Sequence, residues 1–318
     1  MQNFKIHSLL YLTISCSEKK SLENILLNGL GWELYSKSNI SKELINQINY
    51  KKNLVDSELN IFRSPNSKTG MIRVLEGDDR IREKQRSLRW GGFEVVVMYD
   101  IDKLFNKLLN FDNFIPISPP ENYDFTDVNS NIHRAFSAIL PGGTHATFTM
   151  KITEPKNRLF PKSGSQVGHI FEIPLNTSDY IKTKKFYEED LGLIKILEAI
   201  SNNGPLHKSW KIPVGENYSL GIFKSSGSNS GLGSIEIHGC RKIFLDKEIM
   251  FDDSLDGGAC IVTFAVNNII ELHKYLKILN MKTSPVIKLK EAPYNGNLTF
   301  IVYGPNNEKI EFIDFSKT

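Results

Sequence analysis

Short apolar runs alternate with amphipathic stretches along this chain, and the same order recurs four times. The first unit opens with alternating apolar and polar residues around Leu12, and a helix-like pattern through Leu22 and Leu26 then stops at Gly29. Alternation with a period of two is typical of a half-buried strand, and apolar spacings of three and four are typical of an amphipathic helix. Further strand-like runs follow the helix. Each unit is therefore predicted to be a strand, a helix and about three more strands over roughly 75–90 residues.

The three later units repeat this order. They open at GGFEVVVMYDIDKLFNKLLN, at GHIFEIPLNTSDYIKTKKFYEEDLGL and at GACIVTFAVNNIIELHKYLKILNM. In each, an Asp, Ser or Asn stands between strand and helix, where its side chain can accept a hydrogen bond from the first helical turn. The segment KITEPKNRLFPKSGSQ is typical of a linker because it is rich in Pro, Lys, Ser and Gly. It divides the chain into two predicted halves, residues 1–155 and 165–318.

Composition favours a soluble protein that acts on a small molecule. Of the 318 residues, 40% are hydrophobic and 24% charged, and a net charge of +3 gives no basic stripe for nucleic acid. The three cysteines form no CxxC pair, and no apolar run approaches the roughly 20 residues of a membrane span. We therefore expect a cytoplasmic protein with a small-molecule substrate and without nucleic-acid or membrane partners. A homodimer is compatible with the sequence.

Two local motifs carry a family resemblance. The strand HIFEIPL beginning at His169 is followed by KFYEEDLGL, in which Phe186-Tyr187 precedes Leu191-Gly192. The second motif is GPNNEKIEF, close to the C-terminal end of the sequence. Together with the fourfold layout, these features resemble the vicinal oxygen chelate superfamily of glyoxalase, bleomycin-resistance and extradiol-dioxygenase proteins. The resemblance covers nearly the whole chain, although the first two units match it only loosely. It implies an α+β fold of four βαβββ modules, paired as two cupped, barrel-like halves that hold a divalent metal.

The resemblance also implies which residues bind that metal. Family ligands lie on the opening and last strands of the modules, and these positions fall on His169, Glu236 and Glu311. A carboxylate on an otherwise apolar strand is costly to bury unless a cation or hydrogen-bond donor meets it. One histidine and two carboxylates suit Mn²⁺, Zn²⁺, Co²⁺ or Ni²⁺ in Lewis-acid chemistry, with Fe as the redox alternative. The alternative for His169 and Glu311 is a structural role, with Glu311 paired to Lys309 or another cation.

The corresponding positions in the other units carry no ligand by the same count. They fall on Leu9, Phe93, Thr147 and Ile261. The first half is therefore expected to be a structural copy, and Ile261 stands where an extradiol dioxygenase needs a second histidine. A register error of one residue would reverse which side chains face inward.

Two further residues are predicted near the substrate. His238 shares the parity of Glu236 and is expected to move a proton in the cup. Tyr294, in the loop EAPYNGN, is expected to contact the substrate. The alternatives are an exposed histidine at the strand end and ordinary turn packing for the tyrosine.

The expected function is a redox-neutral isomerase, epimerase or lyase acting on a small substrate with two adjacent oxygens. The resemblance implies that the metal coordinates both oxygens and stabilises the enediolate that forms when a carbon-bound proton is removed. A ring-cleaving dioxygenase is one alternative. A metal-free protein that binds a small molecule, as resistance members of the family do, is the other.

Overall fold

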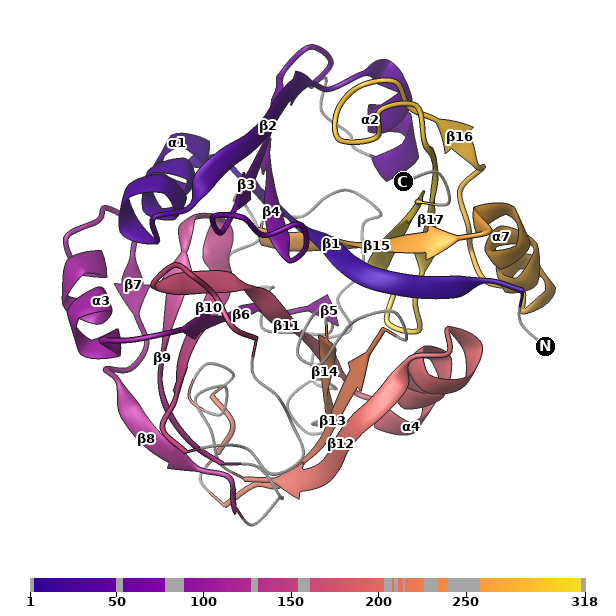
Figure 1. Cartoon of the computed structure of the whole chain (residues 1–318). Coiled ribbons are helices and arrows are strands. Elements are labelled where there is room, and N and C mark those ends of the chain that lie inside the picture. The colour runs from indigo at the N-terminus through magenta and orange to yellow at the C-terminus, as the bar shows by residue number, and fades with distance from the viewer. Residues whose placement is uncertain are drawn as a thin grey trace.

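The computed structural model contains two large mixed sheets with helices at their sides (Figure 1). It describes residues 3–49, 54–77, 89–126, 131–153, 161–202, 208, 211–213, 215–225, 234–239 and 258–315. Within these residues every unit contains a strand, a helix and at least three further strands, so the α+β class and the fourfold repeat are confirmed. The two sheets are cupped, and neither closes into a barrel.

The first sheet is built from the first and fourth units. Its strands, in spatial order, are β16 (Ile287–Lys288), β17 (Leu298–Tyr303), β18 (Lys309–Asp314), β15 (Gly258–Asn267), β1 (Lys5–Cys16), β4 (Met71–Glu76), β3 (Glu58–Arg63) and β2 (Glu33–Asn39). The opening strands β1 and β15 pair antiparallel at the centre, and each pairs in parallel with the last strand of its own unit.

The second sheet is built in the same way from the second and third units. Its strands, in spatial order, are β12 (Ile194–Ser201), β13 (Tyr218–Lys224), β14 (Ser234–Gly239), β11 (Val167–Thr177), β6 (Gly92–Val97), β10 (Thr144–Lys151), β9 (Ile132–Leu140) and β7 (Ile115–Pro116), with β5 (Arg89–Trp90) on β11 and β8 (Glu121–Asp124) on β9. The opening strands β6 and β11 again pair antiparallel at the centre.

This topology corrects the expected pairing of units. We expected each cup to lie within one half, residues 1–155 or 165–318, whereas each sheet takes one unit from either side of residue 160. The periodicity of a sequence identifies the units, but which opening strands pair is decided by contacts between residues far apart in the chain. The linker position therefore did not predict the composition of the sheets.

The main apolar core lies between the convex faces of the two sheets. It contains inward side chains of both sheets together with apolar residues of the flanking helices. Figure 1 shows α1 and α3 at one side of the sheets and α4 and α7 at the other. The helices are α1 (Lys19–Asn24), α2 (Lys42–Ile48), α3 (Ile101–Leu108), α4 (Tyr180–Lys185) and α7 (Ile269–Ile278), and π-helical turns follow α1 (Ile25–Gly29) and α4 (Phe186–Asp190). The two concave faces therefore point away from this shared core.

The two sequence motifs of the resemblance meet across this core. Tyr187, from the turn after α4, donates a 2.8 Å hydrogen bond to Glu308, which lies just before β18. The backbone NH of Asn306 donates to the other carboxylate oxygen of Glu308, and the amide of Asn306 donates to Thr183. Glu308 is completely buried. These bonds tie the third unit in one sheet to the fourth unit in the other.

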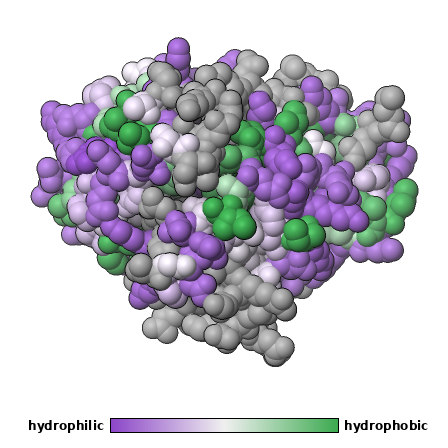
Figure 2. Space-filling model, turned by 90° about the horizontal axis from the view of Figure 1, so that it is seen from below, coloured by the Kyte–Doolittle hydropathy of each residue, from purple (hydrophilic) through white to green (hydrophobic). Residues whose placement is uncertain are grey.

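The described helices and one face of the molecule (Figure 2) bear on contacts with a membrane or another protein. None of the described helices is long and apolar enough to cross a membrane. Figure 2 shows one face of the molecule, where the coloured apolar residues stand apart among hydrophilic ones. The described residues on that face therefore form no continuous apolar patch of the kind that marks a stable interface.

Candidate metal centre in the second sheet

Three glutamates converge on the concave face of the second sheet. Glu94 lies on β6, Glu172 on β11 and Glu236 on β14, and one carboxylate oxygen from each lies within 4.8 Å of the others. Glu94 and Glu172 are directly opposite each other in the antiparallel pair. All three residues are buried. The three strands at the centre of the sheet therefore bring three carboxylates to one point.

The strand pattern explains why these side chains face the cup. On each strand the residue next to the glutamate, Val95, Ile173 or Ile235, belongs to the core between the sheets. Because successive side chains on a strand point to opposite faces, the glutamates face the concave side. The cost of placing them there is a local concentration of negative charge away from water.

That charge is the main reason to expect a cation here. Three ionised carboxylates within 4.8 Å of one another repel strongly where water is scarce. Among described groups, Thr149 on β10 donates a hydrogen bond to Glu94, and Nε2 of His238 lies 3.4 Å from Oε1 of Glu236. Carboxylate oxygens are hard donors suited to divalent cations such as Mn²⁺ and Mg²⁺. The donor set and its spacing thus fit the divalent metal that the resemblance implied.

Of the three ligands expected from the sequence, Glu236 alone belongs to this group. His169 lies three residues before Glu172 on β11, and its Nε2 receives no hydrogen bond from any described residue. Burial lowers the pKa of His169 to about 4. The choice of His169 was three residues too early on the strand: the residue seven positions before the N-cap Asp179 is Glu172, as Ile261 is seven positions before the N-cap Asn268 in the fourth unit.

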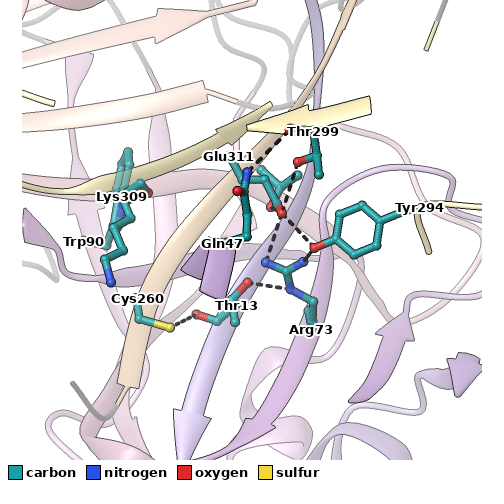
Figure 3. A network of polar contacts seen from close by, with 10 residues as sticks. Thr13, Gln47, Arg73, Trp90, Cys260, Tyr294, Thr299, Lys309 and Glu311 are labelled. Atoms are coloured by element: carbon teal, nitrogen blue, oxygen red, sulfur yellow. Dashed lines mark hydrogen bonds and ion pairs between the residues drawn. The ribbon is translucent and has the colours of Figure 1, made fainter. Parts of the chain in front are cut away.

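Glu311 lies in the other sheet, far from this group in the strand order, and is committed to different partners (Figure 3). Its Oε2 lies 3.0 Å from Nη2 of Arg73 and accepts a 2.7 Å bond from Thr263. Its Oε1 accepts a 2.7 Å bond from the hydroxyl of Tyr294. Glu311 and Arg73 are both sealed from solvent. The structure therefore does not bring Glu311 together with His169 and Glu236.

Arg73 supplies the positive charge in the first sheet. Burial alone would lower the pKa of Arg73, but Glu311 and Tyr294 beside it raise the pKa above its ordinary value. Its other nitrogens donate to Tyr294 and Thr13 at 2.6 and 2.8 Å. The guanidinium of Arg73 therefore balances the charge of Glu311, so this carboxylate needs no bound metal ion.

Tyr294 is fully buried, which corrects its expected place beside the substrate. Its hydroxyl links Arg73 to Glu311, and burial raises its pKa well above the ordinary value, so the hydroxyl keeps its proton and donates. A second apolar cluster closes the concave face of the first sheet over this network. Its members come from α2, from the loop before β17 and from the strands themselves, and include Leu44, Ile48, Ile261, Leu289, Ile301 and Ile313.

The two cups can be compared position by position. Seven positions separate Glu172 from the N-cap residue Asp179 of α4, and the same number separates Ile261 from the N-cap residue Asn268 of α7. Glu236 is paired with the residue two after Glu172, and Glu311 with the residue two after Ile261. Ile261 thus occupies in the first sheet the position that Glu172 occupies in the second. Ile261 was also expected from the sequence at the ligand position of the fourth unit.

Glu94 and Glu172 were missed at the sequence level, although a signal was present. In GFEVVV and IFEIPL each glutamate stands within a run of apolar strand residues. The same pattern had drawn attention to Glu236 and Glu311. The position expected in the second unit was Phe93, one residue away, which faces the core instead. Glu94 also belongs to the half that was expected to carry no ligand.

Known structures share this architecture. Glyoxalase I from Zea mays superposes with a TM-score of 0.62 at 12% sequence identity, covering 98% of this chain and 93% of that one. A Bacillus subtilis protein described as a "putative dioxygenase" superposes with a TM-score of 0.61, also at 12% identity, covering 98% of this chain and 86% of that one. No family model and no curated protein matches the sequence itself. At this identity the likeness establishes the fold over nearly the whole chain.

Proposed function

The chain has the vicinal oxygen chelate fold, and from this premise we propose that it is a divalent-metal-dependent, redox-neutral isomerase, epimerase or lyase acting on a small vicinally oxygenated substrate. The observation that carries the proposal is the group of Glu94, Glu172 and Glu236 in the cup of the second sheet. Buried carboxylates in such a group call for a cation. The cup of the first sheet has its charge balanced by Arg73 and is closed, so it is assigned a structural role.

The three glutamates would hold the metal, and one of them, Glu236, would also move a proton. Glu94, Glu172 and Glu236 would hold the metal, which when bound polarises the substrate oxygens as a Lewis acid. Glu236 is 8% exposed, against 7% for Glu94 and 1% for Glu172, and it lies beside His238. It can take a proton from a carbon next to the polarised carbonyl and return it to the neighbouring atom. Such a transfer changes the position of a proton and exchanges no electrons with a second reactant.

The donor set favours this chemistry over ring cleavage with oxygen. Non-haem Fe(II) oxygenases use two histidines and one carboxylate. Here three carboxylates form the group, and His169 and His238 on the same strands are not members of it. The superposition on a "putative dioxygenase" supports the fold alone, because the identity is 12%.

Deuterium exchange tests the proposal. Purified protein loaded with Mn²⁺ or Zn²⁺ is incubated in D₂O with a panel of α-hydroxyaldehydes and α-hydroxyketones, and loss of the α-proton signal is followed by NMR. We expect metal-dependent exchange that Glu236→Gln abolishes and Glu311→Gln preserves. Oxygen consumption with catechols by the Fe(II)-loaded protein would contradict the redox-neutral assignment, as would exchange that survives Glu236→Gln.

A further inference from the structure

Asn176 and His238 face each other at the next step along the cup of the second sheet. They are paired with each other between β11 and β14, two residues beyond the pair that contains Glu236. On β14 the alternate residues Ile235 and Ile237 belong to the core, so His238 faces the same side as Glu236. The two side chains are 0% and 1% exposed, whereas Glu236 next to them is 8% exposed.

The polar atoms of this pair have no hydrogen bonds within the protein. Neither Oδ1 nor Nδ2 of Asn176, and neither ring nitrogen of His238, has a hydrogen-bond partner among the described residues. Nε2 of His238 lies 3.4 Å from Oε1 of Glu236. A buried polar group without a partner costs about 1–3 kcal/mol. Four such atoms in one place lower the stability of the fold, and native proteins form hydrogen bonds with nearly all of their buried polar atoms. A role in stability therefore does not explain this pair.

The first sheet shows that the fold itself does not need polar residues there. By the correspondence established from the helix N-caps, the position of Asn176 is held by Ala265 and that of His238 by Ile313. These two residues are also paired with each other and pack in the apolar cluster that closes the first cup. The same backbone position is therefore apolar in the closed cup and polar in the cup that carries the three glutamates.

We propose that Asn176 and His238 form a subsite that hydrogen-bonds a neutral carboxamide or hydroxyl group of the substrate, next to the oxygens held at the glutamates. This subsite rests on the proposed function because it adds a second anchoring point to the same cup. The asparagine offers both a donor and an acceptor, and the imidazole has at least one N–H donor in either protonation state. A substrate carboxylate would lie close to Glu236 and be repelled, so the neutral group fits better.

Three hydroxamates of nearly equal shape test the subsite. Malonamic hydroxamate carries a carboxamide, 3-methylbutanohydroxamate an isopropyl group and malonic hydroxamate a carboxylate on the same short arm. Their Kd values are measured by calorimetry or ligand-observed NMR on protein loaded with Mn²⁺ and on protein stripped with EDTA. Metal content is measured separately. We expect the carboxamide to bind about five- to tenfold more tightly than the isopropyl probe, the value of one or two hydrogen bonds.

Variants distinguish a binding role from a structural one. Asn176→Leu and His238→Phe should remove the preference for the carboxamide, while the isopropyl probe binds as before. Asn176→Leu should also keep or raise the Tm, because it removes two buried polar atoms without partners in exchange for an apolar side chain of similar length. Asn122→Leu, on the exposed edge strand β8, is the control and should keep the preference.

The outcomes separate this inference from the proposed function. Equal binding of the carboxamide and isopropyl probes in both preparations, including no measurable binding of either, contradicts the subsite. A lower Tm for Asn176→Leu with an unchanged probe preference also contradicts it and assigns the pair to the fold. If the protein binds no metal but still prefers the carboxamide probe to the isopropyl probe, the metal-dependent function is contradicted and the subsite is supported.

Discussion

Glu94 and Glu172 lie directly opposite each other on β6 and β11, although 78 positions of the sequence separate them (172 − 94). Like charges at directly opposed positions of an antiparallel pair destabilise a sheet. Glu236 adds a third carboxylate within 4.8 Å. A bound divalent cation would relieve the repulsion within this group, and the first prediction below depends on that relief.

Removing one charge should stabilise the metal-free protein. We expect Glu172→Gln to raise the free energy of unfolding of EDTA-treated protein by about 1 kcal/mol, because the change relieves repulsion within the group. The measurement is urea unfolding in EDTA. Glu311→Gln is the matched control and should lower the stability, since Glu311 is paired with Arg73. Equal losses for both variants would show that the three glutamates are not a repulsive group.

Breaking the ion pair of the first sheet should be severe. Arg73→Met leaves the carboxylate of Glu311 buried without its cation, and removal of one partner of a buried pair costs about 3–5 kcal/mol. Chemical denaturation measures the loss. The double variant Arg73→Met with Glu311→Leu removes both charges and should recover most of it. A double variant as unstable as Arg73→Met alone would mean that the network acts through more than its charges.

Acid should destabilise the fold in part through His169. Burial lowers its pKa to about 4, from an ordinary value of about 6.5, so the unfolded chain binds the extra proton between these two pH values. Stability due to this residue is complete above about pH 6.5 and falls toward pH 4 by about 3 kcal/mol. His169→Gln should flatten the curve of unfolding free energy against pH in this interval. A variant curve parallel to that of the wild type would show that folding does not lower the pKa of His169.

The bond between the two motifs should contribute to stability and not to metal binding. Tyr187→Phe removes the hydrogen bond to the buried carboxylate of Glu308, and bonds to charged groups are worth about 1.5–3 kcal/mol. Thermal and urea unfolding should show this loss with unchanged metal content. Tyr99→Phe, at an exposed tyrosine, serves as the control and should change little. A loss of bound metal in Tyr187→Phe would contradict this prediction, because it would show that the bond also supports the metal site.

The repeat pattern was enough to predict the units, because the alternation of strands and the helix-like spacing are local properties of the sequence. Of the two candidate caps in the third unit, Ser178 and Asp179, Asp179 accepts a bond from the backbone NH of Lys182, and Tyr187 and Glu308 both belong to segments chosen from sequence. The pairing of β1 with β15 and of β6 with β11 was not predictable in this way, since it depends on contacts between distant units.

The candidate site was predicted in part for a related reason. Glu236 was found because it interrupts an apolar strand, and Glu172 shows the same signal two residues after the strand's Ile170. The family comparison instead selected His169, because a histidine at the start of a strand is the more familiar metal ligand, whereas the spacing to the helix N-cap points to Glu172. Glu311 carried the right signal, but its partner Arg73 comes from the first unit, and nothing local indicates that contact.

Metal stoichiometry tests the central claim most directly. Protein purified without chelators is analysed for bound divalent metal, alongside Glu172→Gln and Glu311→Gln. The structure leads us to expect one equivalent per chain, lost in Glu172→Gln and retained in Glu311→Gln, because the carboxylate in the cup of the first sheet is already paired with Arg73. Two equivalents per chain, or metal lost in Glu311→Gln and kept in Glu172→Gln, would contradict the assignment of the site to the second sheet.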